Sequence, residues 1–281
     1  MKKLSLFGAI ALVLGLSACT KTQEPQSGEL VKVTFNVAAL GVDVEPMTKS
    51  SINASDGLSK INYAITGSTD TKSGTQTITA NPDEFGTIEL WLSPGTYTAY
   101  IAGYSTAADK NAIINRVDDG FVVYTDNADT FIYASTITID AETNNYDVTL
   151  ARYTGKLVID ITDETIPDDV KGLKYEFGKY NTYHLAKGLT PNGGNISESV
   201  MKSNGQFPEF GYYMFQSPEM TLTISALGEN NAILGATSVS IQIYKNKRTI
   251  VRGNILDVIT QKGLTITYND EWGTDVIVPL Q

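Results

Sequence analysis

The chain has 281 residues, of which 31 are acidic and 21 are basic, so its formal net charge is −10. A protein this acidic is not expected to bind nucleic acid, because neutralising phosphate groups requires clustered lysine and arginine side chains. It contains one cysteine and one histidine, which excludes an internal disulfide and a zinc site built on two imidazoles. No catalytic motif is present, so we expect a protein that is not an enzyme and that needs no cofactor or metal.

The amino end has the pattern of a bacterial secretory signal. Two lysines precede an apolar stretch over residues 4–16, which is too short for a membrane-spanning helix. Small residues follow, and then Cys19, a pattern that resembles the lipobox of bacterial lipoproteins. That resemblance implies that residues 1–18 are removed and that an acylated Cys19, carrying palmitate or a similar chain, anchors the protein in the outer membrane at the cell surface. The alternative is an ordinary signal peptide with a chance cysteine.

Residues 19–29 are polar and lack apolar periodicity, so we interpret them as a flexible tether. The first predicted strand follows directly. Its apolar residues Val31, Val33, Phe35 and Val37 alternate with polar ones, which indicates a strand with one buried face and one solvent-facing face.

The remaining chain continues with short segments rich in threonine, tyrosine, valine and isoleucine, separated by turn residues. These predicted strands cover residues 88–92, 97–102, 121–124, 130–139, 146–150, 156–161, 220–227, 237–244 and 264–268. Residues 196–203 carry a weak helical signal and are expected to form one or two turns of helix. Many short strands with one apolar face need a second sheet to cover them, so we predict an all-β protein built from β-sandwiches.

A division into two domains is expected near residue 151. One predicted strand ends at residue 150 and another begins at 156, and a Ser-Pro pair precedes an alternating strand both at Ser93-Pro94 and at Ser217-Pro218. The chain is long enough for two domains. We therefore predict an N-terminal sandwich over residues 30–150 and a C-terminal sandwich over residues 151–281.

Several of these segments resemble known protein families. The run from Leu92 to Tyr97, LSPGTY, looks like the L-x-P-G-x-Y turn of transthyretin-like β-sandwich modules. The wider layout resembles the fimbrillin-like lipoproteins of Bacteroides-type bacteria, through the lipobox, the first strand, the loop 47–50, the junction 151–156 and the segment 247–254. The resemblance implies two tandem transthyretin-like, Greek-key β-sandwich domains and the function of a pilus subunit in cell adhesion.

In that family a protease cuts after the first strand, the strand leaves, and a strand from a neighbouring subunit fills the groove. Here this implies cleavage at Lys49 and displacement of residues 31–37 as an edge strand. Lys49 is a lysine, so an arginine-specific protease would leave it intact, and it is equally interpretable as an ordinary loop residue. The implied partners are other fimbrial subunits, outer-membrane lipid, and a host protein or glycan.

The donated strand implied by this scheme is the apolar tail. Its residues are Val276, Ile277, Val278 and Leu280. The alternative is that the tail is simply the last strand of the second domain, with Pro279 at its end or edge.

A rival function is a surface glycan-binding lipoprotein of a polysaccharide-uptake system. Its binding platform would be an aromatic cluster, which stacks on sugar rings when exposed and otherwise belongs to the second core. The cluster consists of Phe207, Phe210, Tyr212, Tyr213 and Phe215. His184 is interpreted as a structural residue, and Trp91 as either exposed or packed at the domain junction.

Overall fold

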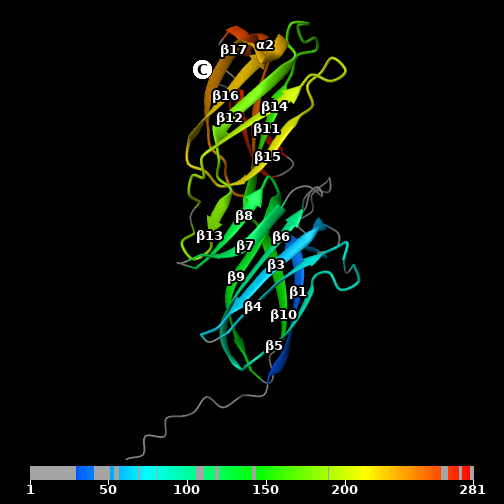
Figure 1. The fold of residues 1–281 in the computed structure, drawn as a ribbon, viewed down its shortest axis with the longest axis vertical. Helices are drawn as coiled ribbons and strands as arrows, with labels where there is room; N and C mark the ends of the chain where they lie inside the picture. The colour runs from blue at the N-terminus through cyan, green and yellow to red at the C-terminus, as the bar shows by residue number, and fades with distance from the viewer. Residues whose placement is uncertain are drawn as a thin grey trace, which may run out of the picture.

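The computed structural model describes residues 30–40, 51–53, 57–68, 70–80, 82–105, 111–117, 120–140, 144–188, 190–260, 265–271 and 274–278. Most of these residues are in β-strands, and turns and irregular segments connect them; one turn of 3-10 helix lies at Glu229–Asn231 and a short helix, α2, at Ile255–Thr260. The molecule is elongated, with the N-terminal strands at one end and the C-terminal strands at the other (Figure 1). The predicted all-β class is confirmed.

The N-terminal half contains an eight-stranded sheet with the order β2-β1-β10-β9-β6-β3-β4, to which β5 is added by pairing with β1. The strands are β1 (Val31–Leu40), β2 (Ser51–Asn53), β3 (Lys60–Thr66), β4 (Thr71–Thr77), β5 (Thr87–Leu92), β6 (Gly95–Ser105), β9 (Asp129–Ile139) and β10 (Asn145–Arg152). The Gln76 side chain joins β4 to the start of β5, because its Nε2 donates to the Thr87 carbonyl at 2.6 Å and its Oε1 accepts from the Gly86 N–H at 3.1 Å. The sheet thus curls around its own core, which includes Phe35, Ile61, Ile88, Ile101 and Phe131.

The prediction that the first strand lies at a sheet edge is wrong. β1 pairs in parallel with β10 on one side, over Thr34 to Ala39. On the other side it pairs antiparallel with β5 and then with β2. The alternating pattern correctly predicts the buried face, where Val33 and Phe35 are fully buried, but it carries no information on backbone neighbours, which distinguish an edge strand from an inner one.

The turn that resembles transthyretin-like modules connects β5 to β6, as the LSPGTY motif implies. Leu92 ends β5 and Gly95 begins β6. The Tyr97 hydroxyl donates to the Ser93 carbonyl at 3.0 Å, so the tyrosine ring is buried while its hydroxyl closes the turn. Burial raises the pKa of Tyr97, and nearby Asp70 raises it further.

A three-stranded sheet crosses the expected domain boundary. It has the order β13-β8-β7, formed by β7 (Asn111–Val117), β8 (Gly120–Asp126) and β13 (Thr182–His184). The residues of β13 come from the C-terminal half of the chain but pair with β8 of the N-terminal half. The division at residue 151 stays a prediction, and the chain does not separate cleanly there, because β10 itself runs on to Arg152.

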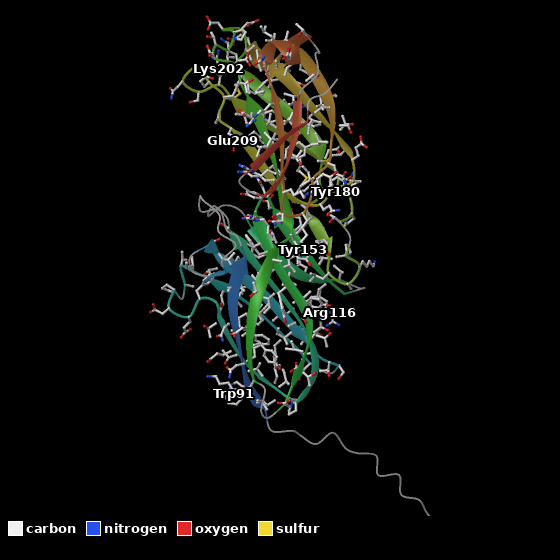
Figure 2. All side chains as sticks on the ribbon, turned by 180° about the vertical axis from the view of Figure 1, so that it is seen from behind. Trp91, Arg116, Tyr153, Tyr180, Lys202 and Glu209 are labelled. Atoms are coloured by element: carbon white, nitrogen blue, oxygen red, sulfur yellow. The ribbon has the colours of Figure 1, made fainter. Side chains whose placement is uncertain are left out.

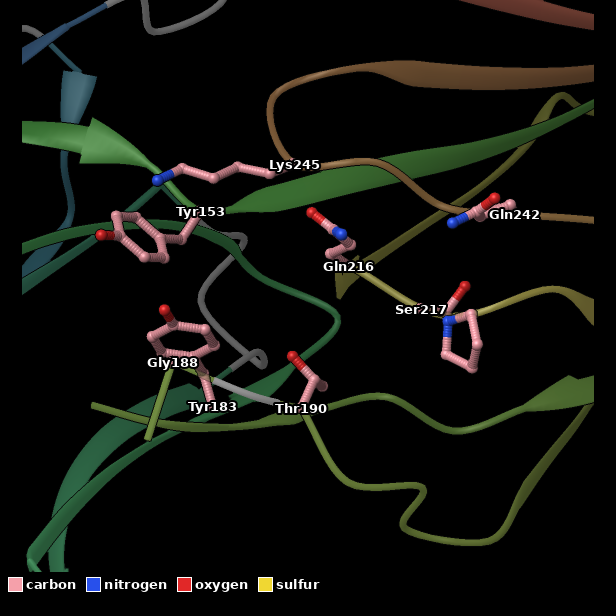
Figure 3. Close-up of a pocket in the computed structure, with 9 residues that line it drawn as sticks. Tyr153, Tyr183, Gly188, Thr190, Gln216, Ser217, Gln242 and Lys245 are labelled. Carbon is pink, nitrogen blue, oxygen red and sulfur yellow. The ribbon is translucent and has the colours of Figure 1, made fainter. Parts of the chain in front are cut away.

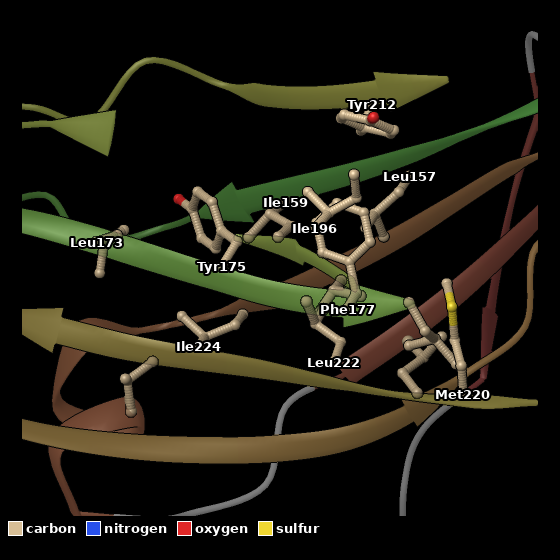
Figure 4. Close-up of a cluster of buried hydrophobic side chains, with 14 of the residues drawn as sticks. Leu157, Ile159, Leu173, Tyr175, Phe177, Ile196, Tyr212, Met220, Leu222 and Ile224 are labelled. Carbon is tan, nitrogen blue, oxygen red and sulfur yellow. The ribbon is translucent and has the colours of Figure 1, made fainter. Parts of the chain in front are cut away.

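The C-terminal half is a sandwich of two sheets. The five-stranded sheet has the order β15-β11-β18-β19-β20, with β11 (Thr154–Ile161), β15 (Phe210–Phe215), β18 (Arg248–Gly253), β19 (Thr265–Glu271) and β20 (Thr274–Val278). The four-stranded sheet has the order β14-β12-β16-β17, with β12 (Gly172–Gly178), β14 (Asn195–Met201), β16 (Met220–Leu227) and β17 (Ile233–Ile241). Side chains of β11, β12 and β16 meet in the core, among them Leu157, Phe177 and Leu222 (Figure 4).

The helix expected over residues 196–203 is wrong. This segment forms β14, which pairs antiparallel with β12 along its whole length. Ile196 and Val200 are four residues apart, which suits a helix face. Pairing with β12 prevails because it satisfies the backbone and buries Ile196 against the core, a tertiary effect that local propensity does not contain.

Candidate interaction site

The two halves meet at a buried ion pair. The Arg152 guanidinium contacts Asp129, with Nε 3.0 Å from both carboxylate oxygens and Nη2 2.9 Å from Oδ2. The Thr154 hydroxyl donates to the same carboxylate at 2.9 Å. The side chains of Arg152 and Asp129 are only 1% and 4% exposed. Burying charges is costly unless they are paired and hydrogen-bonded, and here the Arg152 Nε donates to both carboxylate oxygens while the Thr154 hydroxyl donates to one of them.

Backbone hydrogen bonds also cross the junction. The Tyr180 carbonyl accepts from Phe215 N–H in β15, and the adjacent Asn181 carbonyl accepts from Thr125 N–H in β8, each at 2.8 Å. The carbonyls of the consecutive residues Tyr180 and Asn181 therefore bind one strand of the C-terminal half and one strand of the N-terminal half. Together with the pairing of β13 and β8, these bonds connect the halves through several points rather than through a single linker.

Beside this junction lies a cavity of about 420 Å³ (Figure 3). Its walls come from the connection between β10 and β11, from β13 and the segment after it, and from the β15–β16 and β17–β18 loops. The lining residues are Tyr153, Tyr183, Gly188, Thr190, Gln216, Ser217, Pro218, Gln242 and Lys245. A volume of this size accommodates a small organic ligand.

One end of the cavity is formed by two tyrosines and a lysine. The Lys245 ammonium lies 3.2 Å from the centroid of the Tyr153 ring, a cation–π contact (Figure 3). The rings of Tyr153 and Tyr183 meet edge to face, with centroids 5.1 Å apart. Burial, and then the neighbouring Tyr153, raises the pKa of Tyr183, so its hydroxyl stays protonated and able to donate near neutral pH.

The opposite wall is held in place by its own hydrogen bonds. The Ser217 N–H donates to the Ile243 carbonyl at 3.0 Å, and the Ser217 hydroxyl oxygen accepts from the Ile243 N–H at 3.0 Å. The Tyr244 hydroxyl donates to Gln242 Oε1 at 2.8 Å. Because that oxygen is occupied as an acceptor, the Gln242 amide presents its NH₂ group as the remaining polar function.

No protein-family model and no curated protein matches the sequence. Solved structures do match. The chain has the fold of candidate adhesins from Bacteroides. One from Bacteroides thetaiotaomicron is 11% identical, with a TM-score of 0.57, and the match covers 91% of this chain and 100% of that one. Another from Bacteroides ovatus is 10% identical, with a TM-score of 0.54, covering 89% and 96%.

A candidate polysaccharide-binding protein from Bacteroides thetaiotaomicron has the same fold. It is 9% identical to this chain, with a TM-score of 0.56, and the match covers 88% of this chain and 98% of that one. At such low identities these matches establish the fold alone. They agree with the fold that the resemblance to fimbrillin-like lipoproteins implies.

The aromatic cluster singled out in the sequence belongs to the core. Tyr212 is 4% exposed and Phe215 is fully buried. Phe207 and Phe210 pack against the C-terminal core to which Tyr212 belongs (Figure 4 shows Tyr212), whereas Phe215 belongs to a smaller cluster with Ala102 and Val123. Tyr213 is half-buried beneath Lys156, whose ammonium lies 5.4 Å from the ring centroid. This cluster therefore does not form an exposed platform for sugars.

His184 and Trp91 lie far from each other. His184 is half-buried on β13, where it pairs with Val122, as expected of a structural residue. Trp91 is 58% exposed on β5, near the end of the molecule remote from the junction (Figure 2), so the alternative that placed it at the junction is wrong.

Some of the remaining predicted site residues lie outside the described residues. These are Cys19, Lys49 and Leu280, and their predicted roles stay predictions. Residues 276–278 form part of β20, where Val276, Ile277 and Val278 pair with β19.

The described residues set two further limits on the site. No helix among them is long and apolar enough to cross a membrane. In the same part of the chain, no group of three histidine, cysteine, aspartate or glutamate side chains is arranged to hold a metal ion. The junction cavity, which sequence patterns did not reveal, is instead lined by aromatic, amide and hydroxyl groups from four separate segments.

Proposed function

We propose that this protein is a lipid-anchored surface protein of the fimbrial or adhesion type, acting by binding and assembly rather than by catalysis. The observation that carries the proposal is the fold, shared over 91% of the chain with a candidate adhesin. The lipobox-like pattern ending at Cys19 supports attachment at the outer membrane.

The shape of the molecule suits this function. β1 begins at the lower end in Figure 1, while α2 and β17 lie at the upper end. An anchor at Cys19 would therefore leave the C-terminal half as the part farthest from the membrane. The buried Arg152–Asp129 pair and the strand shared across the junction would let the two halves transmit force as a unit.

We propose assembly by strand exchange in a form that is consistent with the hydrogen-bonded strand pairs of β1. β1 is held by β10 on one side and by β5 and β2 on the other. Its departure breaks both ladders and exposes the core beneath Val33 and Phe35. β1 would therefore leave only when an incoming strand restores both ladders, and cleavage at Lys49 would remove its covalent tie to β2.

The donor in this scheme would be β20. Among the described residues it is the last strand of its sheet and pairs with β19 alone. Detaching it breaks one ladder, whereas detaching β1 breaks two. The edge position makes β20 the more readily released of the two strands, and the mode of assembly would be β-strand addition.

Limited trypsin treatment of the full chain tests the exchange, with the cut position read by mass spectrometry. We expect the wild-type chain cut at Lys49 to form a ladder of oligomers, and Lys49→Gln, which trypsin cannot cut there, to remain monomeric. A wild-type chain that stays monomeric after complete cleavage at Lys49 would contradict exchange.

Proline substitutions test the donor. Val276→Pro and Ile277→Pro each remove one backbone donor, and because donors alternate between the two sides of a strand, one of them must belong to the ladder. We expect at least one of them to shorten the oligomer ladder. Thr274→Pro, at the first position of β20 where proline is tolerated, is the matched control.

A further inference from the structure

The cavity at the junction is rich in hydrogen-bond donors and has no acidic lining. The nine lining residues include two amides, four hydroxyl groups and one ammonium, and none carries a carboxylate. The protein as a whole has 31 acidic residues against 21 basic ones. A cavity that avoids carboxylates in so acidic a chain favours a ligand with many acceptor oxygens and a negative charge.

Lys245 supplies the positive charge. Other lysines of the protein pair with carboxylates, for example Lys32 with Glu89 at 2.8 Å and Lys174 with Glu176 at 2.8 Å. Within the described part of the chain, the Lys245 ammonium has no ion pair or hydrogen bond, and its contact is the Tyr153 ring. The ring holds the ammonium at the cavity without neutralising it, so its N–H donors stay available to a ligand.

Gln242 supplies donors from the facing wall. Its side-chain oxygen is taken by the Tyr244 hydroxyl, and its backbone carbonyl accepts from the Thr249 hydroxyl at 2.8 Å. The residue is thus fixed on both sides, and its NH₂ group lies toward Gln216 in Figure 3. A donor held in place before binding loses little entropy when a ligand arrives.

We propose that this cavity binds a sugar that carries a carboxylate, with the carboxylate on Lys245 and the sugar hydroxyls on Gln242, Gln216 and the tyrosine hydroxyls. A single ammonium matches the single charge of a carboxylate, whereas a phosphate group usually calls for more than one cation or for arginine. Amides and hydroxyls both donate and accept, as sugar hydroxyls do. The volume of about 420 Å³ admits one or two sugar rings.

A matched pair of ligands tests the charge. Binding of glucuronic acid and of glucose, which differ by a carboxylate in place of a hydroxymethyl group, is measured on the full-length protein by isothermal titration calorimetry. We expect glucuronic acid to bind at least about tenfold more tightly, the effect of one hydrogen bond to a charged group. N-acetylneuraminic acid and galacturonic acid, measured alongside, distinguish the possible sources of the carboxylate.

Two variants test the residues. Lys245→Met should reduce glucuronic acid affinity about tenfold or more and bring it to the level of glucose. Gln242→Glu keeps the acceptor for Tyr244 but places a negative charge in the cavity, so it should weaken the acidic sugar much more than glucose. Lys72→Met, whose exposed side chain lies on β4 of the N-terminal half, is the control and should leave binding unchanged.

Four results would overturn the assignment. The first two are equal binding of glucose and glucuronic acid, and no binding of any of the acidic sugars at concentrations up to about 10 mM. The others are undiminished binding in Lys245→Met, and tighter binding of a short peptide through its terminal carboxylate. The result is separable from the proposed assembly function, because the trypsin-induced ladder depends on Lys49 and β20 and does not involve the cavity.

Discussion

The side-chain oxygen of Asn127 accepts a hydrogen bond from the backbone N–H of Tyr213 at 2.7 Å, although the two residues are 86 positions apart. Asn127 lies in the turn between β8 and β9 with a φ of 52°, a left-handed conformation that asparagine tolerates better than most residues. Tyr213 lies on β15, which forms one edge of its sheet, opposite β20. The N-terminal half therefore covers part of an open edge of the C-terminal half, which protects it from unwanted pairing.

Replacing Asn127 is expected to destabilise the junction. Asn127→Gly keeps the backbone free to adopt its φ but loses the hydrogen bond, which should cost about 1 kcal/mol in the free energy of unfolding. Asn127→Ala should cost about 1 kcal/mol more, because alanine is strained at that φ. Urea unfolding measures both, and Asn127→Asp, which keeps an acceptor, is the control. Equal stability of the glycine variant and the wild type would show that the bond contributes nothing.

Breaking the buried ion pair should have a larger effect. Arg152→Met leaves the Asp129 carboxylate buried without its cation, and such changes cost about 3–5 kcal/mol. The double variant Arg152→Met with Asp129→Leu removes both charges and should recover much of the loss. Thermal and urea unfolding of both variants give the comparison. A double variant no more stable than Arg152→Met alone would mean that packing, rather than charge, dominates at this site.

Gln76 should control the closure of the N-terminal sheet. Gln76→Ala removes both of its bonds to the start of β5, so the Gly86 amide hydrogen should exchange faster with solvent and the chain should lose about 1 kcal/mol of stability. Gln76→Glu keeps the acceptor for Gly86 but not the donor to Thr87. It should therefore protect the Gly86 amide while still lowering stability, and equal exchange rates in the two variants would contradict this account.

Stability should fall at alkaline pH because of buried tyrosines. Burial raises the pKa of Tyr175 well above its ordinary value of 10.0, so the folded state binds its proton more tightly than the unfolded state. The resulting stabilisation is complete below pH 10 and is lost as the pH rises above it. Tyr175→Phe cannot ionise and should lose less stability between pH 10 and 12. Urea unfolding of the two proteins at a series of pH values would show this. An identical fall of the free energy of unfolding with pH in the two proteins would contradict it.

The sequence is most informative where side-chain periodicity alone decides the structure. Alternation in residues 31–37 correctly identifies a strand and its buried face, and the LSPGTY run correctly places a turn before a core strand. The structure adds that the Tyr97 hydroxyl closes this turn. In the aromatic cluster, the prediction of core burial is confirmed for Tyr212 and Phe215. These features depend on local backbone geometry and on hydrophobicity, which neighbouring residues specify among themselves.

Tertiary structure decides which backbones become neighbours. Four features join segments that are distant in sequence. They are the enclosed position of β1, the pairing of β14 with β12, the pairing of β13 with β8 of the N-terminal half, and the cavity beside Lys245. Periodicity reports the face that a residue buries, because that depends on the residue and its neighbours in sequence. It cannot report which strand supplies the hydrogen-bond partners, because every backbone offers the same N–H and C=O groups and only packing of the whole chain selects among them.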